Sequence, residues 1–207
     1  MSGNRERRSE EAGLFGRMLV SDFSHFMDMP NDVPGPARRL AAHLAAIVRA
    51  GSARPVGVGE TSAVGCTKRP RRRPCDGFVM VFRHGNGEIA WSCEVCGDEG
   101  LITGWEGSPS DVSGLDDGYV NGVPVAVVMS RAMFDLLGEV TVLDPGAELL
   151  IARARGTSEG VVLVGPSDAF DELVGDVASE ANAATDRRRA RLLDGACAVL
   201  EAALAEE

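Results

Sequence analysis

Four cysteines placed around two strand-like segments constrain the fold of this chain more than any other feature. They are Cys66, Cys75, Cys93 and Cys96, separated by eight, 17 and two residues. No apolar run reaches the roughly 18 to 20 residues of a membrane-spanning helix, and the N-terminus lacks the apolar stretch of a signal peptide. We therefore expect a cytoplasmic protein with no membrane partner. In that reducing compartment, cysteines are metal ligands or catalysts more often than disulfides.

A predicted β-hairpin brings these cysteines together. The runs GFVMVFR and EIAWSC are typical of strands, and the HGNG segment between them is a strong turn signal. Cys75 and Cys93 lie at the outer ends of the two strands, which antiparallel pairing places side by side. His84 lies at the turn, about 25 Å away at roughly 3.3 Å per residue, too far to share a metal. The pattern therefore favours four cysteine ligands over three cysteines and one histidine.

The ligand set is typical of a structural zinc site, because Zn²⁺ prefers four soft or borderline ligands at tetrahedral corners. Cys93 and Cys96 flank a tight turn, and Gly97 lets the backbone fold back on the metal. The loop from Cys66 to Cys75 is less regular, since its length exceeds the usual two to four residues and it contains two prolines. A redox pair is less favoured because the segment after Cys96 resembles a turn and a strand, where such a pair would precede a helix. Catalytic zinc is less favoured because four cysteines and no nearby histidine leave no open position, and disulfides because the chain is expected to be cytosolic. We expect one structural Zn²⁺.

These residues resemble the zinc ribbon, a family of small three-stranded modules found in RNA polymerase subunits, transcription factors and many enzymes. The resemblance covers about residues 53–106 and is most specific from Cys93 to Gly97. The whole chain is also similar to bacterial proteins that carry a CGDEG-type knuckle followed by a Trp-containing strand. That similarity implies a cytoplasmic bacterial setting and no particular activity.

The remaining segments predict an α+β fold, with the zinc-ribbon hairpin module inserted between an N-terminal helix and a C-terminal β-α-α-β-α-α unit. Apolar residues at helical spacing predict the N-terminal helix, which Gly51 is expected to end, and Ser130 and Ser167 are expected to cap later helices. Two C-terminal strands are too few for a free-standing sheet, so we expect them to pair with each other, with the segment at 53–59 or with a partner chain. The predicted divisions are a disordered tail over 1–12, an N-terminal arm and helix over 13–52, the zinc ribbon over 53–106, a linker over 107–122 and an α/β C-terminal unit over 123–207.

Charge is distributed unevenly. Up to Asp111 the chain has 14 basic and 14 acidic residues, so the whole net charge of −10 lies in the C-terminal part. Nucleic-acid contact must therefore be local. The candidate is the loop between the first two cysteines, which holds five cations in six residues: Lys68, Arg69, Arg71, Arg72 and Arg73. The alternative is that these side chains offset the thiolates and nearby acids, or pair with the acidic C-terminal half.

Other signals favour structure over chemistry. Trp91 and Trp105 are expected to fill the core of the ribbon, with stacking on bases as the alternative. Cys197 is expected to pack against the core of the C-terminal unit. The sequence shows no nucleophile-and-base pair and no phosphate-binding glycine motif. An enzyme is therefore less favoured, although an active site assembled from scattered residues is not excluded.

Three functions stay open at this stage. The first is a non-enzymatic zinc-binding regulator or adaptor that contacts nucleic acid through the basic loop at 68–73. The second is a protein-interaction module whose basic loop binds an acidic partner. The third is a redox enzyme or hydrolase without a recognisable motif. The sequence also leaves open whether the last helix forms a homodimer.

Overall fold

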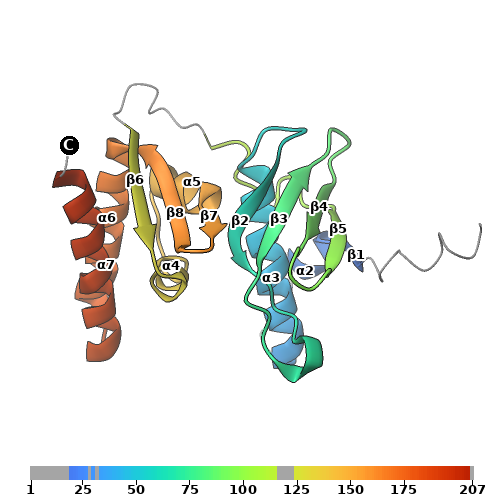
Figure 1. The fold of residues 1–207 in the computed structure, drawn as a ribbon, viewed down its shortest axis with the longest axis horizontal. Coiled ribbons are helices and arrows are strands. Elements are labelled where there is room, and N and C mark those ends of the chain that lie inside the picture. The colour runs from blue at the N-terminus through green and yellow to red at the C-terminus, as the bar shows by residue number, and fades with distance from the viewer. Residues whose placement is uncertain (1–18, 28, 31–32, 116–123, 206–207) are drawn as a thin grey trace, which may run out of the picture.

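The computed structural model describes residues 19–27, 29–30, 33–115 and 124–205. The predicted disordered tail over 1–12 and the second half of the predicted linker lie outside these residues. The described chain combines helices and sheets, as the α+β prediction requires, in two units that lie side by side (Figure 1).

The N-terminal unit is a five-stranded sheet in the order β1-β5-β4-β3-β2. Its elements are β1 (Leu19–Asp22), α2 (Ser24–Met27), α3 (Gly35–Ser52), β2 (Gly59–Gly65), a 3₁₀ turn (Pro70–Arg72), β3 (Phe78–Arg83), β4 (Ile89–Ser92) and β5 (Glu99–Thr103). The predicted hairpin is β3–β4, and its register pairs Val81 with Trp91. Neighbouring strands are antiparallel except β1 and β5, which are parallel.

Helix α3 covers one face of this sheet because its apolar residues recur every three to four positions. Leu44, Ile47 and Val48 are fully buried against strand residues such as Ile89 and Ile102. The helix runs one residue past Gly51, which was expected to end it. A Cβ at Gly51 would lie 2.8 Å from the Ile89 side chain, so this glycine permits close packing of helix on sheet.

The C-terminal unit is a three-stranded antiparallel sheet in the order β6-β8-β7, with α6 and α7 forming an outer layer (Figure 1). Its elements are β6 (Pro124–Met129), α4 (Arg131–Leu137), α5 (Pro145–Arg153), β7 (Arg155–Thr157), β8 (Gly160–Pro166), α6 (Ser167–Ala183) and α7 (Arg187–Ala205). The two predicted strands, β6 and β8, do pair with each other. Strand β7 is an additional short strand that forms a hairpin with β8.

The two units are joined where β2 passes β7 and the end of α5. The backbone N–H of Ala63 in β2 donates to the carbonyl of Ala154, at 3.0 Å. Arg54, only 4% exposed, donates to the carbonyl oxygens of Ala152 and Ala154 and pairs with Glu60. A buried arginine with these partners fixes the end of α3 to the C-terminal unit.

Candidate metal centre and basic loop

The four predicted ligand cysteines meet at one end of the N-terminal sheet. Their Sγ atoms all lie within 4.8 Å of one another, so they could hold a metal ion. The Sγ atoms of Cys66 and Cys96 are 3.6 Å apart, and those of Cys75 and Cys93 are 3.8 Å apart. A tetrahedral ion with metal–sulfur distances of about 2.3 Å has sulfur–sulfur edges of about 3.8 Å. The cluster therefore has the size of a four-thiolate site, and each short edge joins the two halves of the motif.

Cys93 and Cys96 form a tight knuckle. The Cys93 backbone N–H donates to the carbonyl of Asp98 at 2.7 Å, and the Gly97 N–H donates back to the carbonyl of Cys93 at 2.8 Å. Gly97 has φ +70°, a left-handed backbone conformation that glycine adopts without steric cost. This conformation is what turns the chain back over the sulfurs, as the sequence predicts.

The long loop from Cys66 to Cys75 is closed by backbone hydrogen bonds at its base. The Cys66 N–H donates to the carbonyl of Gly77 at 2.8 Å, and the Cys75 N–H donates to the carbonyl of Lys68 at 2.9 Å. Two further N–H groups point at sulfur: that of Lys68 lies 3.5 Å from the Cys66 Sγ, and that of Gly77 lies 3.4 Å from the Cys75 Sγ. These hydrogen bonds hold Cys66 and Cys75 in place within the cluster, although eight residues separate them.

Gly77 is a residue of the site that the sequence analysis missed. A Cβ at this position would lie 2.7 Å from the Cys93 Sγ and 2.8 Å from the Val95 side chain. Only a glycine lets the strand that follows Cys75 approach the opposite ligand so closely. Its position two residues after a ligand cysteine was the available signal.

Burial and backbone N–H groups act in opposite directions on the thiols. Burial raises the pKa of Cys66, and the N–H of Lys68 lowers it by less. Burial also raises the pKa of Cys93, but hydrogen bonds from the N–H groups of Cys96 and Val95 and from the thiols of Cys75 and Cys96 together lower the pKa overall. A bound cation would favour the thiolate form of every ligand, so metal binding would release protons.

The other chemically notable residues lie outside the cluster. His84 is at the hairpin turn, with its ring 4.6 Å from that of Phe82 between centroids. Trp91 and Trp105 are buried in the core of the N-terminal unit, which confirms their predicted packing role and removes them as stacking platforms. Cys197 is half-buried on α7 against the core of the C-terminal unit, also as predicted.

The basic loop presents all five cationic side chains to solvent. Lys68 pairs with Asp98 at 3.2 Å, beside the knuckle. Arg71 and Arg72 have φ values of +53° and +67°, which turn the loop sharply between its two prolines. Within the described part of the chain, no acidic group pairs with the four arginines. Among the described residues of the loop, Lys68 is thus the cation that forms an ion pair with a nearby acid, as the alternative interpretation expects.

Residues beside the ligands also contact the C-terminal unit, which the sequence did not predict. The Arg131 guanidinium carbon of α4 lies 5.2 Å from the ring centroid of Phe78, three residues after Cys75. The same guanidinium occupies the space that a Cβ at Gly65 would need, directly before Cys66. The chain therefore contacts the C-terminal unit both just before Cys66 and shortly after Cys75.

No family model, curated protein or solved structure matches this chain. The resemblance to zinc ribbons therefore stays a prediction based on the cysteine pattern. In the helices of the described residues there is no segment long and apolar enough to cross a membrane.

Proposed function

We propose that the four cysteines hold one structural Zn²⁺, and that the protein is a non-enzymatic cytoplasmic regulator or adaptor that contacts nucleic acid through the loop at 68–73. Four cysteine sulfurs in a tetrahedral arrangement are typical of sites that bind zinc or iron. Zinc is the better candidate because the cysteine pattern resembles that of zinc ribbons, and a set of four chain ligands leaves no coordination position for a substrate, so the ion would be structural. The ion would serve as a cross-link between the β3–β4 hairpin and the base of the loop.

The nucleic-acid part of the proposal rests on the exposure of the loop arginines and on their lack of acidic partners in the part of the chain that the structure describes. Arg69, Arg71, Arg72 and Arg73 are exposed and have no acidic partner among the described residues. The loop projects below the N-terminal sheet, apart from the helices α6 and α7 (Figure 1). Four unneutralised cations on a loop with a fixed base favour a polyanionic partner.

The mode of contact follows from what the loop lacks. Trp91 and Trp105 are buried, so no tryptophan beside the loop offers a base-stacking surface. The arginines would bind phosphate groups, which are the same in every sequence. We therefore expect weak, salt-sensitive binding with little sequence preference.

The test compares two double variants with the same change in net charge. Arg72→Ala with Arg73→Ala should weaken binding to a labelled DNA duplex and to single-stranded RNA, and should lower the slope of log affinity against log salt by about 1.5. Arg187→Ala with Arg188→Ala, at exposed positions of α7, should change neither quantity. Equal binding by the parent and the loop variant, or no binding by the parent, contradicts the proposal. Binding to polyglutamate with the same dependence on the loop would favour the acidic-protein alternative.

Zinc itself is tested by elemental analysis of the purified protein. One zinc per chain is expected. One iron per chain, or a stable protein without metal, would overturn the assignment.

A further inference from the structure

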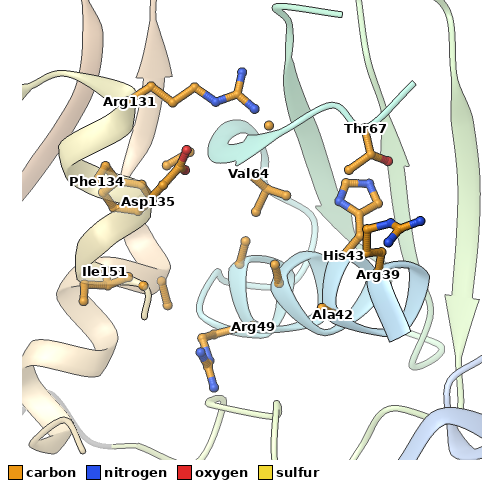
Figure 2. A pocket seen from close by; sticks show the side chains of 16 residues that line it. Arg39, Ala42, His43, Arg49, Val64, Thr67, Arg131, Phe134, Asp135 and Ile151 are labelled. Carbon is orange, nitrogen blue, oxygen red and sulfur yellow. The ribbon is translucent and has the colours of Figure 1, made fainter. Parts of the chain in front are cut away.

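A cavity of about 520 Å³ lies between the two units (Figure 2). Helix α3 forms its floor, the end of β2 and Thr67 form one wall, and α4 with the end of α5 forms the opposite wall. The volume falls in the range of pockets that enclose small organic molecules.

The cavity exists because α3 presents small side chains on this face. Ala42, Ala46 and Ala50 lie one helical turn apart and all line it, while the large apolar residues of α3 point into the sheet. Phe134 and Ile151 complete the apolar surface from the other unit. Because the alanine side chains are small, they leave this space open, and an apolar molecule can occupy it without movement of the backbone. Larger residues at these positions would fill it.

Polar side chains with unused hydrogen-bonding groups border this apolar surface. In the part of the chain that the structure describes, the side chains of His43, Thr67 and Arg131 make no hydrogen bond within the protein. Figure 2 shows Arg131 extending from α4 towards the opposite wall, where Thr67 and His43 lie. The His43 ring is held edge-on against Trp91, with 6.1 Å between ring centroids. Three hydrogen-bonding groups from three elements thus border one apolar space.

The charges favour an anion with a single charge. Arg131 is a cation on the wall formed by α4, and Arg39 lies beside His43 on α3 (Figure 2). Arg49 also lines the cavity but pairs with Glu148 at 3.3 Å and points away. Asp135 follows Arg131 by one helical turn and opposes additional negative charge. Partial burial raises the pKa of Asp135 although Arg131 lowers it, while the residue as a whole is exposed to solvent.

We propose that this cavity binds a small organic monoanion with an apolar body, of the class of medium-chain or aromatic carboxylates. The apolar body would lie on the alanine face of α3, between Ala46 and Phe134. The carboxylate would accept hydrogen bonds from Arg131, Thr67 and His43. The cavity adjoins the metal centre, since Gly65 and Thr67 flank Cys66. It uses neither the four cysteines nor the cations at 68–73, and it does not depend on the proposed nucleic-acid contact.

Titration calorimetry with octanoate tests the proposal on the full-length, metal-loaded protein. One octanoate should bind per chain, octanamide should bind about tenfold more weakly or worse, and acetate should show no saturable binding, because both the charge and the apolar body are needed. Ala46→Leu and Ala42→Leu should each abolish octanoate binding by filling the cavity. Ala202→Leu, at an exposed position of α7, is the matched control and should bind like the parent.

Two charge variants separate this site from general hydrophobic binding. Arg131→Gln should weaken octanoate binding by about tenfold, since it removes a charge-assisted hydrogen bond. Asp135→Asn should strengthen octanoate binding severalfold and leave octanamide unchanged, because it removes a like charge. Binding that survives Ala46→Leu, equal binding of octanamide and octanoate, or no saturable octanoate binding by the parent would each overturn the proposal. Retained metal content together with an unchanged far-UV circular dichroism spectrum in every variant shows that both units are folded.

Discussion

The two units of this protein differ in the size of their apolar cores. The core of the C-terminal unit gathers 20 of its own buried residues and Ala63 of β2, whereas that of the N-terminal unit gathers 11, in both cases among the described residues. The cysteines form a separate cluster at the end of the N-terminal sheet, beyond its apolar core. A small core that cannot hold all of its chain is often supplemented by a metal. We therefore expect the proposed metal ion to replace apolar burial in the N-terminal unit and to be dispensable for the C-terminal unit.

Loss of the metal should have the largest effect, and it should be confined to one unit. Cys93→Ser is expected to remove the bound metal and to cost the N-terminal unit about 10 kcal/mol, the order of the binding free energy of structural zinc sites. Both tryptophans belong to that unit, so their fluorescence should change at temperatures where far-UV circular dichroism still reports the helices α6 and α7. Cys197→Ser is the control and should retain the metal. Coincident loss of both signals in Cys93→Ser would contradict the independence of the C-terminal unit.

A core truncation should produce the reverse pattern. Phe170 on α6 is fully buried in the C-terminal core, and Phe170→Ala should cost about 3–5 kcal/mol through lost burial and the cavity left behind. Urea denaturation followed by circular dichroism measures the loss, and the metal content should equal that of the parent. Val164→Ala, at a half-exposed strand position, should cost much less. Metal loss in Phe170→Ala would show that the two units fold as one.

The junction between the units can be weakened without touching either core. Arg54→Met should cost about 3 kcal/mol, because it leaves the carboxylate of Glu60 and the buried carbonyls of Ala152 and Ala154 with fewer partners. We expect the fluorescence and circular dichroism transitions to separate in this variant. Arg38→Met, at an exposed position of α3, should leave both transitions unchanged. A single transition at the parent midpoint would show that Arg54 does not hold the units together.

The smallest effects come from adding one methyl group to each unit. Gly77→Ala should cost about 1–3 kcal/mol and weaken metal retention against a chelator, because the new Cβ overlaps the Cys93 sulfur. Gly175→Ala in α6 meets no atom within 4 Å and should stabilise the C-terminal unit by about 0.5–1 kcal/mol. Thermal denaturation measures both. Equal effects of the two changes would show that the packing at Gly77 is looser than the structure indicates.

Local signals predicted the elements of the fold more successfully than their ends. The Ser130 hydroxyl accepts the N–H of Met133, as a predicted helix cap should, at 3.3 Å. Ser167 is instead the first helical residue, and Pro166 takes the capping position without a side-chain hydrogen bond. The short strand β7 was missed because three residues carry too little periodicity to distinguish a strand from a turn.

The sequence by itself determined which four cysteines form the cluster, the hairpin that unites them and the composition of the basic loop, because these depend on spacing along the chain. Only the tertiary structure decided the parallel pairing of β1 with β5, the contact of Gly77 with Cys93 and the junction at Arg54. Each of these joins segments distant in sequence, where no local pattern specifies the partner. The cavity beneath Arg131 is of the same kind, since it exists only where α3 and α4, from the two units, face each other.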